Sequence, residues 1–255
     1  YEGIHPYEQV AFQFSHHVME KDGSIRHANE FLCVEPGEFP NYKLVRQLKE
    51  SLEKDEGTIF MWSSYENTIL TAISNQLKED KRKPDDTEAL LTFIQDVTRD
   101  GKRAMVDLCK ISEKSFYHPD TKGSSSIKKV LPALFKVSNH LISKYSKSIY
   151  GSPTGIESKN FKDANGFVWI NKNDEIHDPY KKLRFIAESF LLNGINESEE
   201  GKASIIAEGG SAATAYGRLQ YEDLSLAARE RIKSSLLRYC ELDTLAMVKI
   251  WEVLK

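Results

Sequence analysis

Hydrophobic and polar residues alternate near the start of the chain, which predicts a β-hairpin. Residues 10–14 place apolar side chains at every second position, as in a strand with one buried face. Asp22 and Gly23 form a dipeptide that favours a tight hairpin turn. Residues 26–34 are therefore expected to form the returning strand.

The spacing of apolar residues then changes to that of helices. Residues 41–54 carry apolar side chains three and four positions apart, which predicts an amphipathic helix. The apolar run at 58–62 predicts a buried strand, and residues 65–77 and 85–98 predict two further helices. The order hairpin, helix, strand, helix indicates an α/β domain with a mixed sheet.

The C-terminal half is predicted to be mainly helical. Residues 138–205 are less regular, whereas helices are expected over 212–219 and from about 225 or 231 to 253. No clear linker divides the chain. We therefore interpret residues 1–255 as a single domain with a largely helical insertion at about 138–235.

Composition and cysteine spacing predict a cytoplasmic protein. Of the 255 residues, 40% are apolar and 29% are charged, which is ordinary for a globular domain. No apolar run approaches the roughly 20 residues that a membrane-spanning helix needs, so we expect no membrane partner. The three cysteines match neither a disulfide framework nor a zinc motif, which favours free thiols in a reducing compartment.

Positive charge is concentrated in the middle of the chain. Residues 101–150 contain ten Lys or Arg and three acidic residues, so this stretch carries +7 within a chain of net charge −3. Such a stretch is typical of a phosphate-binding surface, although a solvated lysine-rich surface has the same composition. Lys122 precedes a small-residue loop, and Lys128 and Lys129 follow it at the start of an apolar helix, where backbone N–H groups can bind phosphate. We predict that these lysines contact nucleic acid; the alternative is a flexible loop with a serine cap.

Three side chains are candidates for hydrolytic chemistry. Tyr239 and Asp243 are four residues apart in the last helix, so they lie one turn apart on the same face. Such a carboxylate can hold a hard cation and such a phenol can orient a water molecule, although a half-buried tyrosine beside a solvated aspartate gives the same spacing. Glu66 lies where the strand at 58–62 gives way to a helix. Because two-metal nucleases need carboxylates that converge on Mg²⁺ or Mn²⁺, we expect Glu66 and Asp243 to meet in space.

Two short motifs resemble those of a known enzyme family. Tyr239-x-x-x-Asp243 is similar to the third motif of DEDD-type, DnaQ-like 3′–5′ exonucleases in their Tyr-bearing branch. Residues 62–70 resemble their second motif, with Glu66 where the family usually has Asp. The resemblance implies a ribonuclease-H-like mixed sheet flanked by helices. It also implies Glu66 and Asp243 as ligands of Mg²⁺ or Mn²⁺, and Tyr239 as the group that orients the water.

A second resemblance extends over nearly the whole chain. Five separated blocks, in the same order, resemble a bacterial domain of unknown function that often follows a RecB-like nuclease region. The blocks are residues 6–15, 118–120, 126–132, 209–213 and 238–244. This resemblance implies a fold similar to the ribonuclease-H-like superfamily, with an upstream RecB-like nuclease region of the same polypeptide as a partner.

The chain departs from the superfamily pattern at the first motif. That motif is Asp-x-Glu on a first central strand, which we expect to be missing here because the chain begins at Tyr1, as a fragment or a processed chain does. The one literal match, residues 86–88, follows a charged loop and is typical of a helix start. We therefore predict a metal-dependent 3′–5′ exonuclease-type domain acting on DNA or RNA, incomplete or inactive as given. The alternative is a non-catalytic nucleic-acid-binding or scaffolding module of a larger multidomain nuclease.

Overall fold

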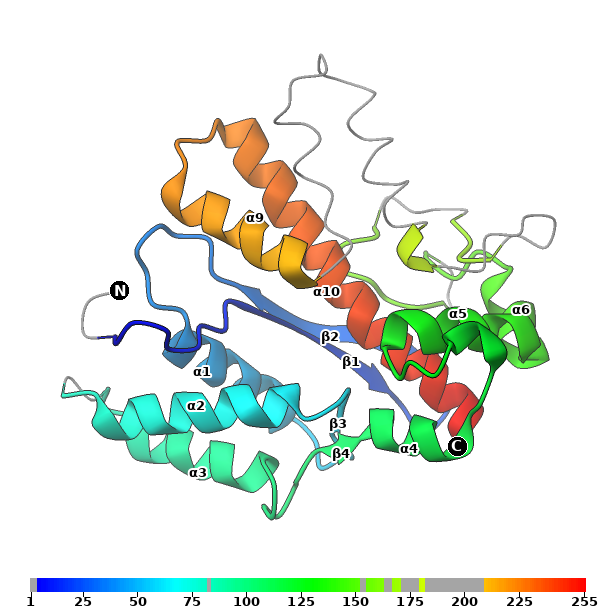
Figure 1. Cartoon of the computed structure of the whole chain (residues 1–255), viewed down its shortest axis with the longest axis horizontal. Helices are drawn as coiled ribbons and strands as arrows, with labels where there is room; N and C mark the ends of the chain where they lie inside the picture. Colours follow the sequence, from blue (N-terminus) through cyan, green and yellow to red (C-terminus); the bar gives the residue numbers. More distant parts are fainter. Residues whose placement is uncertain (1–3, 82–83, 152–154, 163–166, 171–178, 182–208) are drawn as a thin grey trace. The chain divides into compact units, whose positions relative to one another are not determined.

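The computed structural model of the chain is shown in Figure 1, and the residues that it describes are 4–81, 84–151, 155–162, 167–170, 179–181 and 209–255. Within these ranges, helices are combined with two sheets of two strands each, so the predicted α/β class is confirmed. Residues 182–208, which belong to the predicted insertion at about 138–235, lie outside the described residues. None of the described helices is both long enough and apolar enough to cross a membrane.

The chain divides into two compact units, and each is described by itself. The first unit consists of Tyr1–Phe14, Phe31–Cys33 and Gly37–Phe116. The second unit consists of Ser15–Glu30, Val34–Pro36 and Tyr117–Lys255. The interpretation of the chain as a single domain with an insertion stays a prediction.

The hairpin expected from the alternating pattern is present. Its strands are β1 (Gln13–Met19) and β2 (Ile25–Leu32), which form a two-stranded sheet. At the turn, the N–H of Glu20 donates to the carbonyl oxygen of Ser24 at 2.9 Å. Gly23 adopts a φ of +85°, a left-handed conformation that glycine reaches at little cost. Gly23 therefore occupies the left-handed position of the predicted hairpin turn, whereas Asp22 does not have a positive φ.

The described part of the first unit combines four helices with a short pair of parallel strands. The helices are α1 (Asn41–Leu52), α2 (Tyr65–Glu79), α3 (Thr87–Val97) and α4 (Leu108–Ser115). The paired strands are β3 (Phe60–Met61) and β4 (Val106–Asp107). The bounds of α1, β3, α2 and α3 agree with the elements that the apolar spacing predicts, to within about two residues at each end, whereas β4 and α4 were not predicted.

The core of the first unit is built from one face each of α1, α2 and α3. Along α2, the side chains of Leu70, Ile73 and Leu77 are buried, and Leu90 and Ile94 of α3 pack into the same cluster. Their separation by three or four positions places them on one side of each helix. Burying an aliphatic side chain fully stabilises a fold by about 1.5–3 kcal/mol. The buried apolar side chains that stabilise the first unit therefore follow a spacing of three and four residues that can be read from the sequence.

Two buried amide side chains hold the N-terminal segment against α1 and α2. Asn41 Oδ1 accepts from the N–H of Ala11 at 2.7 Å, and its Nδ2 donates to Gln76 Oε1 at 2.7 Å. Both Asn41 and Gln76 also donate to the carbonyl oxygen of Gln9, at 2.9 and 3.0 Å. These hydrogen bonds offset the cost of burying the two amides.

Asp107 links the strand pair to the helix that follows it. Its carboxylate accepts from the N–H of Lys110 at 3.2 Å and therefore caps α4. The same oxygen accepts from the N–H of Ser63, which lies just beyond β3, at 3.1 Å. This acid has a structural role at the junction between a strand and a helix.

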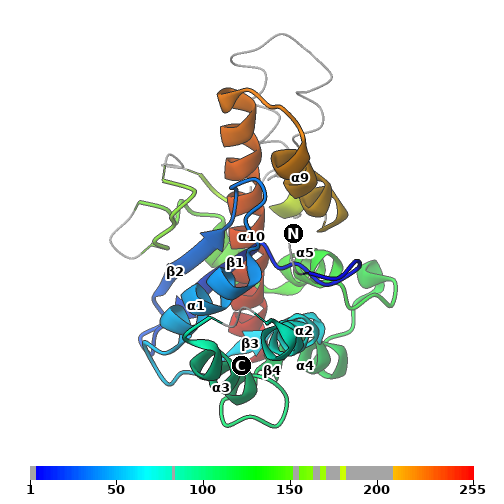
Figure 2. The same ribbon diagram turned by 90° about the vertical axis from the view of Figure 1, so that its left-hand side faces the viewer.

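The described part of the second unit is organised around its longest helix. Its helices are η1 (Pro119–Thr121), α5 (Ile127–Val137), α6 (Asn139–Tyr145), α9 (Gly209–Tyr221) and α10 (Leu226–Leu254). Figures 1 and 2 show α9 alongside the first half of α10, while α5 and α6 pack against its second half. The side chain of Ser225 caps α10 by accepting from the N–H of Ala228, which confirms the earlier of the two expected starts.

The interior of the second unit contains a buried lysine. The side chain of Lys249 is fully buried, and its Nζ lies 4.2 Å from the ring centroid of Trp169 and 4.8 Å from that of Tyr145. Among the described residues, Nζ has no hydrogen-bond partner. Burial lowers the pKa of the Lys249 ammonium well below its ordinary value. Because Lys249 belongs to α10, this helix buries an ionisable group as well as leucine and isoleucine side chains.

Candidate functional site

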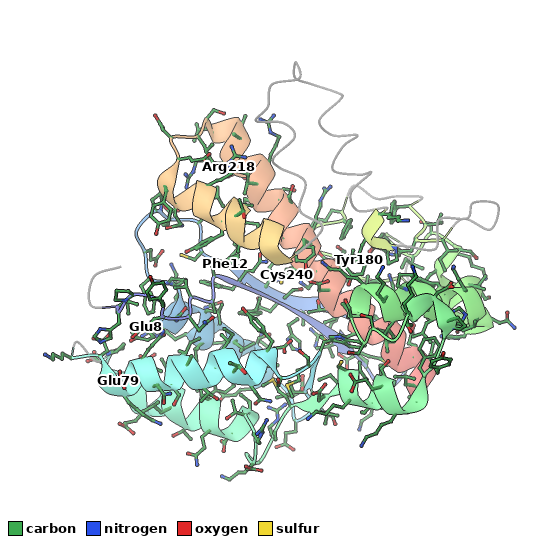
Figure 3. All side chains as sticks on the ribbon, viewed as in Figure 1. Glu8, Phe12, Glu79, Tyr180, Arg218 and Cys240 are labelled. Carbon is green, nitrogen blue, oxygen red and sulfur yellow. The ribbon has the colours of Figure 1, made fainter. Side chains whose placement is uncertain are left out.

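Tyr239 and Asp243 lie one turn apart on α10, as the sequence predicts. The hydroxyl of Tyr239 hydrogen-bonds the carboxyl group of Asp243. Tyr180, which is labelled beside α10 in Figure 3, donates a second hydrogen bond from its hydroxyl to Asp243 Oδ1 at 2.8 Å. Two phenols from separate parts of the chain therefore bind one carboxyl group.

Lys128, in the first turn of α5, completes this arrangement. Its Nζ lies 5.5 Å from the ring centroid of Tyr180 and 5.1 Å from that of Tyr239. An ammonium group within about 6 Å of a ring centroid is attracted to the face of the ring. The two tyrosines are only 5% and 7% exposed, whereas the lysine is half-buried. We refer to Lys128, Tyr180, Tyr239 and Asp243 as the lysine–tyrosine cluster.

Opposing effects act on the carboxyl group of Asp243. Burial raises its pKa above the ordinary value, because an ionised carboxylate loses hydration when it is enclosed. The hydrogen bonds from Tyr180 and Tyr239 lower the pKa, and the positive charge of Lys128 lowers it further. Burial outweighs these contributions, so Asp243 gains a proton more readily than a solvated aspartate does.

The lysine–tyrosine cluster does not by itself fit a divalent metal. A hard cation needs several oxygen ligands, and Asp243 supplies the one carboxylate of the cluster. The ammonium group of Lys128 also opposes a second positive charge at the same place. Within the described ranges, the group of His, Cys, Asp and Glu side chains whose ligand atoms could share a metal includes neither Glu66 nor Asp243. Binding of Mg²⁺ or Mn²⁺ by these two acids stays a prediction.

Glu66 occupies the position that the sequence predicts for it. It lies in the first turn of α2, five residues after the end of β3, and it is half-buried. Glu66 belongs to the first unit and Asp243 to the second, and each unit is described by itself. The expected meeting of these two carboxylates therefore stays a prediction.

The three lysines predicted to contact nucleic acid lie in or before the first turn of α5. Lys129 is exposed beside Lys128, and Lys122 is exposed in the preceding loop, where it ends η1. The first turn of α5 contains no acidic residue, and the side chain of Ser126 does not cap it. The N-terminus of a helix carries a partial positive charge, so this end of α5 favours an anion. Of the three lysines, Lys128 is the one that also joins Tyr239 and Asp243.

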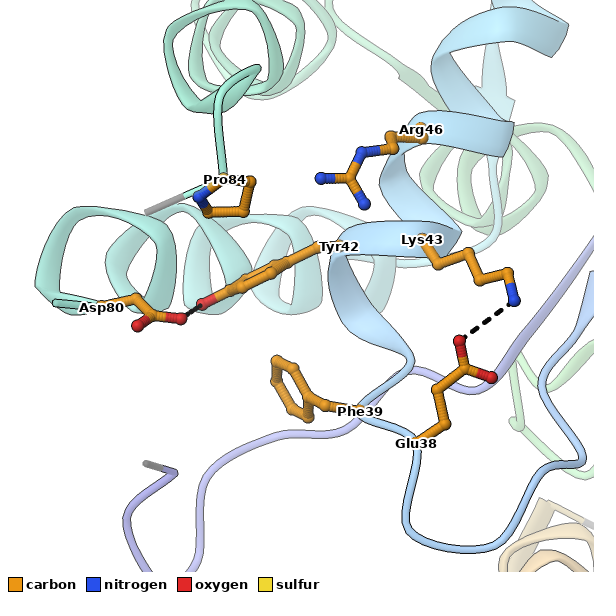
Figure 4. Close-up of a pocket in the computed structure, with 7 residues that line it drawn as sticks. All are labelled: Glu38, Phe39, Tyr42, Lys43, Arg46, Asp80 and Pro84. Atoms are coloured by element: carbon orange, nitrogen blue, oxygen red, sulfur yellow. Dashed lines mark hydrogen bonds and ion pairs between the residues drawn. The ribbon is translucent and has the colours of Figure 1, made fainter. Parts of the chain in front are cut away.

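An open hollow lies beside α1 in the first unit and is shown in Figure 4. Its charged groups are already paired within the protein. Lys43 Nζ lies 3.0 Å from Glu38 Oε1, and Arg46 forms two hydrogen bonds to Asp86 at 2.6 and 2.7 Å. This pairing makes the hollow a weaker candidate than the lysine–tyrosine cluster. Its volume is about 430 Å³, and its lining residues are Glu38, Phe39, Tyr42, Lys43, Arg46, Asp80 and Pro84.

Tyr180 is the member of the cluster that sequence reasoning missed. It follows Pro179 and lies outside the two motifs that indicate hydrolytic chemistry. Its hydrogen bond to Asp243 joins residues 63 positions apart. Local patterns identify a tyrosine and an aspartate on one helix face. They do not reveal that Tyr180, from a distant part of the chain, contacts the same aspartate.

Comparison with protein families gives one match. Residues 1–126 match the family model described as a domain of unknown function (DUF2779). The DUF2779 match ends before α5, so it includes residues 6–15 and 118–120 but neither Tyr239 nor Asp243. No curated protein and no solved structure matches the chain. The comparison therefore supports a domain of unknown function and leaves the RecB-like and DnaQ-like relationships as proposals.

Proposed function

We propose that the chain is a nucleic-acid-binding module of a larger multidomain nuclease, and that its second unit contacts the phosphate backbone. The observation that carries this proposal is the position of Lys128, whose ammonium group lies over the rings of Tyr180 and Tyr239. Ring faces attract an ammonium group without removing its charge. A phosphate that approaches α5 would therefore meet a lysine whose side chain is already ordered.

The surroundings of Lys128 support the same function. Lys122 and Lys129 are exposed nearby in the sequence, and the first turn of α5 has no acid to repel an anion. Within the second unit, residues 117–150 contain six lysines and one acidic residue, a charge of +5, which adds a longer-range attraction for a polyanion. These contacts are made to the phosphate backbone of the nucleic acid. They therefore predict binding that depends little on base sequence.

The test measures the binding of the full chain to a fluorescent single-stranded oligonucleotide by anisotropy at several salt concentrations. Replacing Lys128 removes one phosphate contact, so Lys128→Gln is expected to weaken binding roughly 5–10-fold and to reduce the salt slope by about 0.7. Lys147→Gln is the matched control, because Lys147 is an exposed lysine of the same basic stretch, beyond α6. Equal losses in both variants, or no binding by the native chain, would contradict the proposal.

A second candidate function is a metal-dependent 3′–5′ exonuclease of the DnaQ-like kind, with a ribonuclease-H-like fold. The contact between Tyr239 and Asp243 favours it, because the two residues share one helix face as the resemblance requires. This function also needs Glu66 and further carboxylates beside Asp243. The lysine–tyrosine cluster supplies only one of these acids, so we rank the exonuclease second.

The two functions differ in an assay of strand cleavage. An exonuclease is expected to shorten end-labelled single strands in the presence of Mn²⁺, and Asp243→Asn is expected to abolish that activity. A binding module leaves the strands intact with either form of the protein. Cleavage that is equal in the native chain and in Asp243→Asn would eliminate the proposed role of Asp243.

A further inference from the structure

A histidine and two glutamates converge in the second unit, apart from the lysine–tyrosine cluster. His27 and Glu30 belong to β2, and Glu241 belongs to α10. Each offers one ligand atom, and the three atoms lie within 4.8 Å of one another. We propose that His27, Glu30 and Glu241 form a binding site for a divalent transition-metal cation that ties the hairpin to α10. This site is independent of the proposed function.

The imidazole of His27 provides the first argument. Its Nδ1 lies 3.2 Å from Glu241 Oε2, and both side chains are fully buried. Nevertheless, Nδ1 makes no hydrogen bond among the described residues. A nitrogen lone pair and a carboxylate oxygen repel each other at this distance unless a positive charge lies between them. A shared cation fits, since metal bonds of about 2.0–2.2 Å place neighbouring ligand atoms roughly 3.0–3.5 Å apart.

The other nitrogen of His27 supports the same assignment. Ser15 Oγ lies 2.9 Å from Nε2 and 3.0 Å from Thr244 Oγ1, so Nε2 has a hydrogen-bond partner that is itself held in place. We assign the ring proton to Nε2, which leaves the lone pair of Nδ1 directed toward Glu241. Histidines that bind metals commonly donate their second N–H in this way, which fixes both the tautomer and the ring orientation.

Asn160 holds the two carboxylates together. Its Nδ2 donates to Glu30 Oε2 at 2.6 Å and to Glu241 Oε2 at 2.8 Å, and its backbone N–H also donates to Glu241. Ser158 adds a hydrogen bond to the other oxygen of Glu241. Hydrogen bonds from neutral groups orient carboxylates but do not neutralise them. The arrangement therefore positions two acids and still calls for a positive charge.

The charge balance points to a cation as well. In the part of the chain that the structure describes, no lysine or arginine pairs with Glu30 or Glu241. The ring nitrogens of His27 lie near both carboxylates, with Nε2 at 3.8 Å from Glu30 Oε2 and Nδ1 at 3.2 Å from Glu241 Oε2. A buried carboxylate without compensation is costly, and a divalent cation removes that cost with the three side chains already present.

The ligand set indicates the class of metal. One imidazole nitrogen with two carboxylate oxygens suits Mn²⁺, Fe²⁺ or Zn²⁺ better than Mg²⁺, which is bound mostly through oxygen and water. The buried His27 and Glu241 can contribute without movement, whereas the side chain of Glu30 is 20% exposed and has room to adjust. Because the ligands come from β2 and α10, the cation would act as a structural clamp within the second unit.

The test is the binding of Mn²⁺ to the chelator-treated full chain, followed by electron paramagnetic resonance. We expect one bound Mn²⁺ whose spin-echo signal is modulated by an imidazole nitrogen. His27→Gln should remove that modulation and weaken binding by more than about 100-fold, and Asn160→Ala should weaken it about 10–100-fold. His140→Gln is the control for histidine loss, because His140 is 58% exposed, and it should change nothing.

Three further variants separate loss of the metal site from a folding defect and from an effect of Asp243. Glu30→Gln changes a partly exposed side chain and should weaken Mn²⁺ binding at least tenfold, whereas Glu157→Gln, at an exposed glutamate, should not. Asp243→Asn should leave the nitrogen modulation intact. Absence of bound Mn²⁺, absence of nitrogen modulation, or modulation that survives His27→Gln would each overturn the proposal.

Discussion

The two units differ in what they bury. In the first unit, α1, α2 and α3 enclose a cluster of leucine, isoleucine, valine and phenylalanine. In the second unit, the buried set also includes His27, Glu241 and Lys249, each at most 3% exposed. Apolar burial stabilises a fold directly, whereas a buried ionisable group costs free energy unless a partner compensates it. The first unit is therefore arranged for stability, whereas the second contains buried ionisable groups whose cost points to a functional role.

The largest expected effect comes from opening the apolar core of the first unit. Ile73 is fully buried in α2, so Ile73→Ala is expected to lower the free energy of unfolding by about 2–5 kcal/mol. Ile73→Val keeps most of the volume and should cost only about 0.5–1.5 kcal/mol. Hydrogen exchange of the amides of α2 and α3 measures the loss. Equal protection in the two variants would show that this core is not the source of the unit's stability.

The next effect has the opposite sign and lies in the second unit. Lys249 buries an amine among aromatic rings, so Lys249→Met is expected to raise the free energy of unfolding by about 1–3 kcal/mol. Thermal unfolding at neutral pH measures the gain. A loss of stability would show that the attraction between the ammonium group and the rings outweighs the cost of burial.

The pH dependence of that gain follows from the lowered pKa of Lys249. The folded pKa lies below the unfolded value of about 10.4, so the unfolded chain binds the proton more tightly. The stability of the native chain should therefore rise as pH increases from the folded pKa toward the unfolded one. The advantage of Lys249→Met should shrink over the same range, and a constant difference would contradict the assignment.

The smallest expected effect comes from a surface ion pair of the first unit. Arg46 and Asp86 are each more than one third exposed, so Arg46→Gln is expected to cost only about 0.2–1 kcal/mol. Arg46 lowers the pKa of Asp86, so this contribution is present above the unfolded pKa and is lost as pH falls through the folded pKa. Urea unfolding at pH 7 and at pH 3 measures it. A cost above 2 kcal/mol would place a charged pair among the main supports of this unit.

Much of the fold could be predicted from the sequence because its elements are local. The hairpin, α1, α2 and α3 follow from spacings of two, three and four residues, and the turn at Gly23 follows from a dipeptide. The strands β3 and β4 are only two residues long. The apolar run at 58–62, which predicted β3, therefore extends beyond the paired residues. The ribonuclease-H-like sheet rests on resemblance and stays a proposal.

The candidate sites could be predicted only in part, because they join residues that are distant in sequence. Tyr239 and Asp243 were found because a helix brings them together at a fixed spacing. Tyr180 meets Asp243 across 63 positions, and His27 meets Glu241 through the packing of β2 on α10. No periodicity encodes such contacts, since they depend on tertiary packing. Charge clustering pointed to Lys128, but it could not distinguish that lysine from its exposed neighbour Lys129.

The most direct test of the proposed function is the affinity of Asp243→Asn for a single-stranded oligonucleotide, measured by anisotropy in the presence of a metal chelator. Asp243 places a negative charge beside Lys128, so its removal is expected to favour a phosphate by about 1 kcal/mol, which is roughly a fivefold tighter Kd. A Kd that is fivefold lower than that of the native chain is the result that we predict. Weaker binding by Asp243→Asn would contradict a phosphate-binding role for this cluster.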